Sequence, residues 1–170
     1  YGLVCDIGGS SMELAEVRDG RVGRCVTSAL GPLKFMDRPA KARARHIETE
    51  LDDLTGTMGA QPDRLFLVGG SWRAIARIDM ERRGYPLHVL HEYRMDADAV
   101  ERTVAHIAKA DPDALRSACG ISASRMALVP YAAEVLGRLV RRIAPRDIAI
   151  SAYGIREGIL YERMPQKLRD

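Results

Sequence analysis

Hydrophobic residues along this chain occur in two patterns, short continuous runs and residues spaced by three and four. The alternation of these two patterns along the sequence predicts an α/β fold. Short apolar runs predict five strands, at residues 3–7, 13–17, 21–28, 65–68 and 147–151. Apolar residues spaced by three and four predict helices at residues 39–58, 72–78, 100–108, 128–143 and 154–163, with a short helix restarting at Pro112. The run at 65–68 is apolar throughout, which is typical of a strand with parallel neighbours. The order of these elements predicts one mixed sheet flanked by helices.

Turn and capping residues predict where several of these elements begin and end. Asp19-Gly20 is the residue pair expected in a two-residue hairpin turn between the second and third strands. Gly59 is the expected end of the helix at 39–58. The expected N-caps are Asp37 and Asp96 or Asp98, and Asp111-Pro112 is expected to restart a helix with Pro112 at its first position.

Composition and charge limit the class of protein. With 170 residues, 46% of them hydrophobic and 29% charged, the chain has the composition of one globular domain. No apolar run approaches the roughly 20 residues that span a bilayer, so we expect no membrane partner. Three cysteines without metal-site spacing predict reduced, mostly buried thiols and a cytoplasmic protein. The chain opens at Tyr1 and enters a predicted core strand at once, so we expect residues 1–170 to be a single α/β domain, the second half of a longer protein.

The net charge of +3 suits an anionic partner without identifying one. Arginines cluster at residues 38–45 and 138–146, both within or beside predicted helices. A solvated helix face is the favoured interpretation, and a track for a polyanion is the alternative. No aromatic residues interleave with these arginines, which disfavours a nucleic-acid partner.

The segment at residues 6–14, Asp-Ile-Gly-Gly-Ser-Ser-Met-Glu-Leu, has the composition of a phosphate-binding turn. It follows an apolar strand, and its glycines allow backbone N–H groups to approach phosphate oxygens closely. An acid at the strand end, here Asp6, can hold Mg²⁺ or orient an attacking water. A tight β-turn with an acid beside it by chance is the structural alternative.

Two further glycine segments follow predicted strands: Gly69-Gly70-Ser71-Trp72-Arg73, and Ser151-Ala152-Tyr153-Gly154-Ile155-Arg156-Glu157-Gly158. The carboxyl ends of parallel strands share one edge of a sheet, so we expect the three segments to meet there. In order and chemistry they resemble the DIGGGSTEL, GGTxRAxA and SxxGxREGxL segments of the exopolyphosphatase and guanosine pentaphosphate phosphohydrolase family. The resemblance runs over nearly the whole chain.

The resemblance implies a fold: one ribonuclease-H-like half of the actin-like superfold, with a five-stranded mixed sheet whose second strand is antiparallel. It also implies roles at the first segment. Gly8, Gly9, Ser10 and Ser11 would bind phosphate, and Asp6 and Glu13 would be catalytic and hold Mg²⁺. Ser10 stands where the family usually has a third glycine, so it tests whether that position needs a positive φ. Met12 stands where the family usually has threonine.

The second segment is expected to contribute Gly69, Gly70, Ser71 and Arg73 to phosphate binding, since a helix N-terminus attracts anions. A surface salt bridge is an equal alternative for Arg73. The carboxylate thought to activate the attacking water belongs, in the resembled family, to a preceding half of the protein. That half is an expected partner, and we expect this chain alone to be inactive.

The expected function is release of terminal phosphate from inorganic polyphosphate or guanosine pentaphosphate with Mg²⁺. The alternatives are an ATP-binding half of an actin-like kinase or ATPase, and a non-catalytic regulator that binds a phosphorylated ligand. Neither the choice of substrate nor the oligomeric state, a homodimer among the candidates, follows from the residues.

Overall fold

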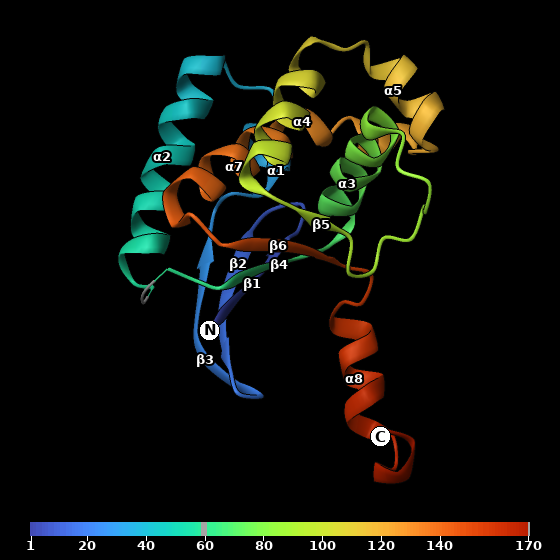
Figure 1. Ribbon diagram of the computed structural model, residues 1–170. Coiled ribbons are helices and arrows are strands. Elements are labelled where there is room, and N and C mark those ends of the chain that lie inside the picture. Colours follow the sequence, from blue (N-terminus) through green and yellow to red (C-terminus); the bar gives the residue numbers. More distant parts are fainter. Residues whose placement is uncertain (59–60, 170) are drawn as a thin grey trace.

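The computed structural model describes residues 1–58 and 61–169, which form one sheet with helices packed against it (Figure 1). The strands are β1 (Gly2–Ile7), β2 (Met12–Arg18), β3 (Arg21–Ser28), β4 (Arg64–Val68), β5 (Arg94–Met95) and β6 (Asp147–Ser151). The helices are α1 (Pro32–Phe35), α2 (Ala40–Gly56), α3 (Gly70–Arg83), α4 (Ala97–Lys109), α5 (Pro112–Cys119), α6 (Ala123–Met126), α7 (Val129–Ile143), α8 (Ile155–Arg163) and the 3₁₀ helix η1 (Gln166–Leu168). The predicted α/β class is confirmed.

The six strands lie in the order β3-β2-β1-β4-β6-β5. The central strands β1, β4 and β6 run parallel, and β2 is antiparallel to both of its neighbours, as expected. The expectation of five strands is wrong, because β5 adds a sixth, antiparallel to β6. This strand has two residues, too few to show a period in the sequence. Its approach to β6 is fixed by backbone bonds of 2.9 Å from Glu92 N–H to Ile150 and from Ile150 N–H to Tyr93.

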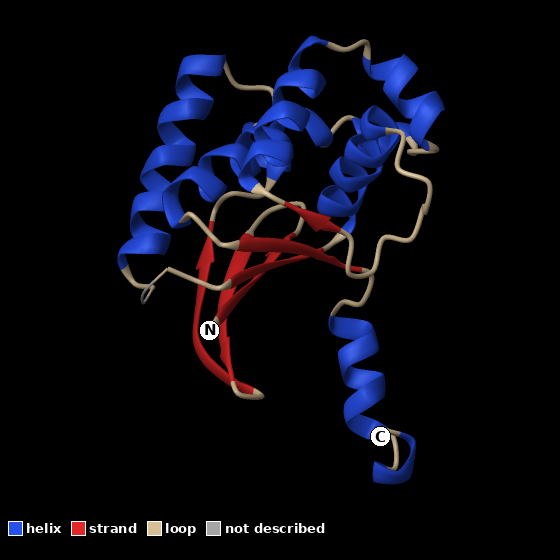
Figure 2. Cartoon of the chain, in the orientation of Figure 1, coloured by secondary structure: helices blue, strands red, loops and turns tan. Residues whose placement is uncertain are grey.

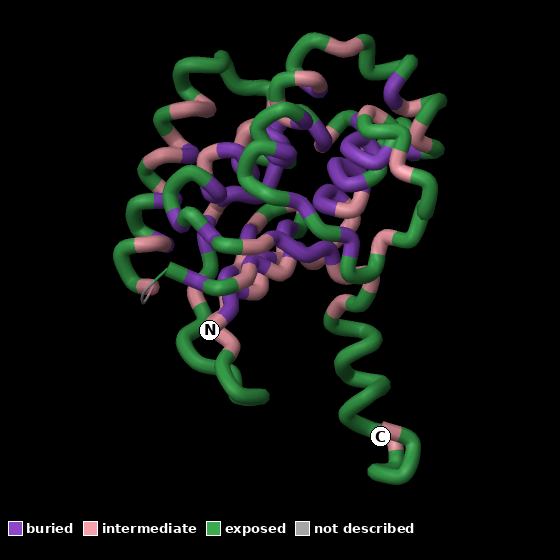
Figure 3. The backbone as a smooth tube through the Cα atoms, in the orientation of Figure 1, coloured by how far each residue is buried: buried purple, intermediate pink, exposed green. Residues whose placement is uncertain are grey.

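The two faces of the sheet are unlike. On β1, Leu3, Cys5 and Ile7 are buried, whereas Val4 and Asp6 between them are only half-buried. Successive side chains of a strand point to opposite faces, and helices α1–α7 cover the face that carries the buried set (Figure 3). The same alternation continues on β2 and β4. One sheet face is therefore the core, and the other is partly open.

Helix α2 begins later than its predicted N-cap. Asp37 was expected to cap it, but the N-cap position is Pro39. A residue that precedes proline is disfavoured in helical geometry, so Arg38 cannot extend the helix back toward Asp37. The predicted cap Asp96 is confirmed, since its side chain accepts from Ala99 N–H at 2.6 Å. The helix predicted to restart at Pro112 is confirmed as well, and the Asp111 side chain caps it by accepting from Ala114 N–H at 3.1 Å. Gly59, the predicted end of α2, lies outside the described residues.

Several clustered arginines form ion pairs between α2 and α7. Arg43 contacts Glu134 at 3.3 Å, Arg142 contacts Glu48 at 2.6 Å, and Arg138 pairs with the same Glu48. The prediction of a solvated arginine face is therefore wrong for these three residues. Their charges are already balanced by carboxylates of the same chain, so the polyanion track has little support here.

Two expectations from composition have different outcomes. Among the described residues, no helix is both long and apolar enough to cross a bilayer. Cys5 is buried and Cys119 half-buried, but Cys25 is exposed, which contradicts the expected burial for that one thiol. It lies on β3, whose central residues mostly face solvent.

Candidate functional site

The three glycine segments meet at one edge of the sheet, as the parallel strand order requires. In the register of the central strands, Asp6 pairs with Val68, and Val68 pairs with Ser151. Gly69 and Gly154 follow immediately after these positions. Asp6, Gly154 and Ile155 line a shared hollow of about 360 Å³. The predicted convergence of the segments is confirmed.

The turn between β1 and β2 presents free backbone donors. Gly8 N–H donates to the Ser11 carbonyl at 2.9 Å and so closes the turn. Within residues 1–58 and 61–169, the N–H groups of Gly9, Ser10 and Ser11 make no hydrogen bond. Ser10 does not adopt a positive φ, so its replacement of the family's third glycine introduces no left-handed strain. Three neighbouring N–H donors are what an anion-binding turn requires.

The segment Gly31-Pro32-Leu33, for which the sequence predicted no role, packs against this turn. Leu33 N–H donates to the Gly9 carbonyl at 2.9 Å. Beside it, Gly31 lies so close to the turn that a Cβ there would stand 2.1 Å from the Ser10 carbonyl carbon and 2.3 Å from Ser11 N. Only a residue without a side chain fits at this position. The signal was the Gly31-Pro32 pair, but nothing in the sequence links it to a turn some 20 residues earlier.

Asp6 and Glu13 form a pair of carboxylates on the partly open sheet face. They are directly opposite each other in the antiparallel pairing of β1 and β2. Burial raises the pKa of Asp6, the negative charge of Glu13 raises it further, and the Arg73 guanidinium partly opposes both. A bound cation would relieve this repulsion, and oxygen ligands suit Mg²⁺, which retains several waters and needs few protein ligands. The pair therefore fits the implied metal, although no group of three or more candidate ligands exists in the described part of the chain.

The second glycine segment contacts two different neighbours. Gly69 has φ +113° and ψ 164°, a conformation reserved for glycine, and a Cβ there would lie 2.8 Å from Asp6 Oδ1. Gly70 instead contacts Arg125, whose guanidinium would lie 2.6 Å from a Cβ. Ser71 is buried and its hydroxyl accepts from Arg125 at 3.3 Å. Gly69 therefore adjoins the carboxylate pair, whereas Gly70 and Ser71 contact Arg125.

Arg73 joins the second segment to the third. Its guanidinium donates to the Ala152 carbonyl at 3.0 Å, and within the described residues Arg73 forms no ion pair. At the start of α8, Gly154 N–H donates to Glu157 Oε2 at 2.7 Å, and this bond lowers the pKa of the Glu157 carboxyl. His91, which lies outside the three segments, packs its ring against Tyr153 with centroids 4.4 Å apart. The contacts of Arg73 and His91 thus join the third segment to α3 and to the segment before β5.

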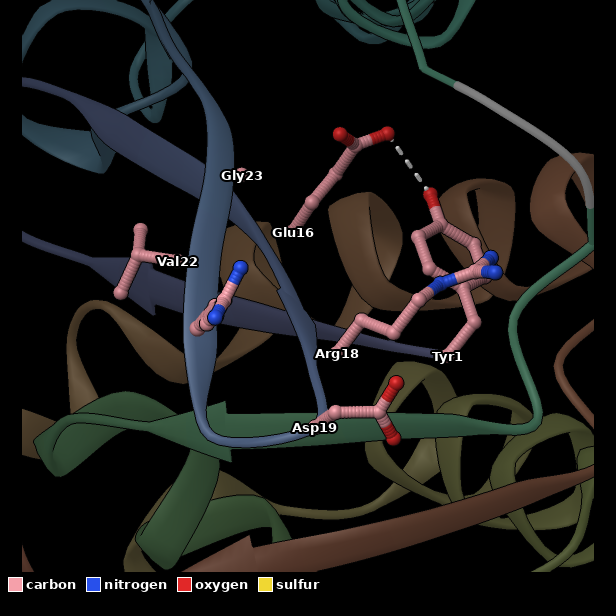
Figure 4. A pocket seen from close by; sticks show the side chains of 7 residues that line it. Tyr1, Glu16, Arg18, Asp19, Val22 and Gly23 are labelled. Atoms are coloured by element: carbon pink, nitrogen blue, oxygen red, sulfur yellow. Dashed lines mark hydrogen bonds between the residues drawn. The ribbon is translucent and has the colours of Figure 1, made fainter.

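A second cavity lies at the opposite end of the strands. It encloses about 650 Å³ and is lined by Tyr1, Glu16, Asp19 and neighbouring residues of the β2–β3 hairpin. Tyr1 donates its hydroxyl to Glu16 at 3.0 Å across this cavity (Figure 4). Because Tyr1 precedes β1 and the candidate turn follows it, the cavity is separated from the carboxylate pair by the length of the strand. It is not part of the candidate site.

Comparison with known families assigns the chain. The model of the Ppx/GppA phosphatase family matches residues 1–167. The chain belongs to this family. This match confirms the resemblance that was inferred from the three glycine segments. In this chain the three segments lie at the sheet edge described above. No curated protein sequence matches it significantly.

Solved structures of Ppx/GppA proteins share the fold. An exopolyphosphatase-like protein superposes with a TM-score of 0.81 at 19% identity, covering 94% of this chain and 58% of its own. An exopolyphosphatase from Cytophaga hutchinsonii gives 0.80 at 18% identity, covering 94% and 55%. The type II variant of the Aquifex aeolicus Ppx/GppA phosphatase gives 0.77 at 17% identity, covering 96% and 57%. The chain thus spans little more than half the length of these structures.

Proposed function

We propose that the protein containing this chain releases terminal phosphate from inorganic polyphosphate or guanosine pentaphosphate in the cytoplasm. The observation that carries the proposal is the juxtaposition of the Asp6–Glu13 pair with three N–H groups of the 8–11 turn, which bond to no group in the described part of the chain. Membership of the Ppx/GppA phosphatase family and the likeness to exopolyphosphatase structures support it.

In this proposal the turn binds the terminal phosphoryl group. The N–H groups of Gly9, Ser10 and Ser11 would donate to its oxygens, where negative charge is spread in the transition state. Asp6 and Glu13 would hold Mg²⁺, which when bound neutralises phosphate charge. Gly69 leaves room for the Asp6 carboxylate to keep its position. Positioning and charge stabilisation are the main contributions that phosphoryl transfer needs from a protein.

The chain would supply one wall of a cleft, as the C-terminal half of a two-subdomain phosphatase. It spans 55–58% of the solved relatives, and its carboxylates lie on a partly open sheet face. The residue that activates the attacking water would lie in the preceding half. The 170-residue chain would then bind phosphate weakly and hydrolyse polyphosphate negligibly.

A non-catalytic regulator is the second candidate. Met12 is fully buried at the end of the turn, so it supplies neither a hydroxyl nor any other polar group at a position where the family usually has threonine. A protein of this kind would bind the phosphorylated ligand without releasing phosphate. An actin-like kinase or ATPase would require a nucleotide instead, and ATP consumption would identify it.

The decisive experiment measures phosphate release by the longer protein from long-chain polyphosphate, guanosine pentaphosphate and ATP. We expect release from at least one of the first two, and a 10²–10⁴-fold lower rate from the 170-residue chain, the range for loss of a positioned general base. Asp6→Asn should lower release sharply without unfolding the protein, because the amide keeps the size and loses the charge. Asp53→Asn, at an exposed position on α2, is the matched control. Binding of polyphosphate without release would establish the regulator.

A further inference from the structure

Positive charge is concentrated in one short segment of this chain, residues 30–47. The only acid in the segment is Asp37, and its five basic residues are Lys34, Arg38, Lys41, Arg43 and Arg45. Five basic residues against one acid give the segment a formal net charge of +4, whereas the whole chain carries +3, so the remaining residues are together slightly acidic. A local excess of one sign of charge raises the local concentration of ligands of the opposite sign. The segment therefore indicates where an anionic partner would bind.

Four of the five basic residues have no carboxylate partner in the described part of the chain. Arg43 is the exception, since it pairs with Glu134 at 3.3 Å. The other four, here called the α1–α2 cations, are all exposed: Lys34, Arg38, Lys41 and Arg45. The next acids along α2 do not neutralise them, because Glu48 and Asp52 pair with arginines of α7. The α1–α2 cations thus differ from the arginines between α2 and α7, whose charges are balanced within the chain.

The α1–α2 cations begin beside the candidate phosphate turn. Leu33 N–H donates to the Gly9 carbonyl at 2.9 Å, and Lys34 is the next residue of α1. Phe35, which follows, stacks on the ring of His46 in α2 with centroids 3.5 Å apart. These contacts connect the turn to α2 through α1.

On α2 the cations line a groove. Helix α2 lies at one side of the helical layer (Figure 2). The groove beside it has a volume of about 540 Å³ and is lined by Pro39, Lys41, Ala42, Arg45, His46 and Thr49. Because Lys41 and Arg45 are four residues apart, they lie on the same side of the helix, separated by about 6 Å along its axis. Cations spaced along a surface in this way suit an extended anion, which can offer each of them a different charged group.

We propose that the α1–α2 cations bind the distal part of an inorganic polyphosphate chain whose terminal phosphate lies in the 8–11 turn. Polyphosphate is linear and negatively charged at every phosphate, so a chain held at one end in the turn can extend over α1 into the groove beside α2. Guanosine pentaphosphate is compact, with all its phosphates on one ribose, and does not need such a surface. The cations therefore favour polyphosphate as the substrate. The inference rests on the proposed function only for the position of the terminal phosphate.

Calorimetric binding to the longer protein, in EDTA so that the chain is not shortened, tests the proposal. The double variant Lys41→Gln, Arg45→Gln should raise the Kd for long-chain polyphosphate roughly 2–30-fold, the range for loss of two exposed charge contacts. Its Kd for tripolyphosphate, which occupies only the turn, should equal that of the wild type. The matched control is Arg102→Gln, Lys109→Gln, which removes the same two charges from exposed positions on α4 and should change neither Kd.

Asp37→Asn should have the opposite effect. It removes the one acid of the segment, so the Kd for long-chain polyphosphate should fall while the Kd for tripolyphosphate stays the same. Added salt should reduce the difference between the wild type and the double variant, because exposed charges are screened. In phosphate release from long-chain polyphosphate, the double variant should raise KM and leave kcat unchanged. Contacts remote from the reacting phosphate bind the substrate and the transition state equally.

Three results would overturn the inference. An unchanged Kd for long-chain polyphosphate in the double variant would show that the chain follows another path. Equal weakening of long-chain polyphosphate and tripolyphosphate would show that the groove does not discriminate by chain length. Tighter binding of single-stranded RNA than of polyphosphate, lost in the same variant, would make the surface a nucleic-acid site. Because binding is measured without phosphate release, a protein that binds as expected but releases no phosphate would refute the proposed function and leave this inference standing.

Discussion

Replacing Gly69 by alanine tests whether the second segment is shaped for the Asp6 carboxylate. With φ +113° and ψ 164°, Gly69 occupies a region that costs other residues about 1–3 kcal/mol. The new Cβ would also stand 2.8 Å from Asp6 Oδ1, closer than ordinary contact, so either the turn or the carboxylate must shift. Thermal unfolding should therefore occur roughly 2–12 °C lower, at about 2–4 °C per kcal/mol for a domain of this size.

Activity should respond more strongly than stability, because a displacement of about 1 Å at a reacting group can lower the rate by about 10²-fold. We expect Gly69→Ala in the longer protein to reduce phosphate release by roughly 10–100-fold at a temperature where it remains folded. Gly56→Ala is the control, since a Cβ there meets nothing within 4 Å and its φ is not positive. If Gly69→Ala unfolded at the wild-type temperature and kept full activity, the assigned contact between the two segments would be refuted.

Two further substitutions test the turn and the core. Gly31→Ala should lower the free energy of unfolding by about 1–3 kcal/mol, the usual effect of overpacking, because its Cβ would collide with the Ser10–Ser11 peptide. A urea midpoint equal to that of the wild type would contradict this prediction. Asp79 is fully buried and accepts from the Tyr93 and Thr103 hydroxyls at 2.7 Å each. Asp79→Ala should therefore lower the free energy of unfolding in urea denaturation by about 1–3 kcal/mol for each buried hydroxyl that loses its acceptor. Burial alone would raise the pKa of Asp79, but hydrogen bonds from Tyr93, Thr103 and Arg82 lower it on balance. Ionised Asp79 therefore stabilises the folded protein at pH values above its unfolded-state pKa of about 3.9, and this stabilisation is lost as the pH falls through its lower folded-state pKa. The urea midpoint of Asp79→Ala should consequently depend less on pH below about 4 than the urea midpoint of the wild type.

Local patterns in the sequence predicted most of the architecture because they are dictated by the core. The apolar runs of β1, β4 and β6 are buried on the helix-covered face, and burial is what makes them visible as runs. Strand β5 was missed because two residues carry no period and its attachment depends on backbone bonds near Ile150. The Asp37 cap was predicted wrongly although the signal was present: Pro39 excludes helical geometry for the residue before it.

The sequence predicted those features of the site that follow from strand topology. It did not predict the contacts that depend on how distant segments pack together. Parallel strands bring their carboxyl ends to one edge, so Asp6, Gly69 and Gly154 had to be neighbours. The close approach of Gly31 to Ser10 depends on the path of the chain after β3, which no local pattern records. The contact of Arg125 with Gly70 joins residues 55 positions apart and was missed for the same reason.

The alternation of buried and half-buried residues along β1 connects the core with the candidate site. Leu3, Cys5 and Ile7 point into the helix-covered core, so Val4 and Asp6 must point to the other face. The residue that begins the phosphate turn is thereby placed on the face that this chain leaves partly open. A helix of this chain over that face would bury Asp6 and close the hollow in which it lies. Covering the face from another part of the polypeptide would instead build the second wall of a cleft, with Asp6 and Glu13 between the two walls.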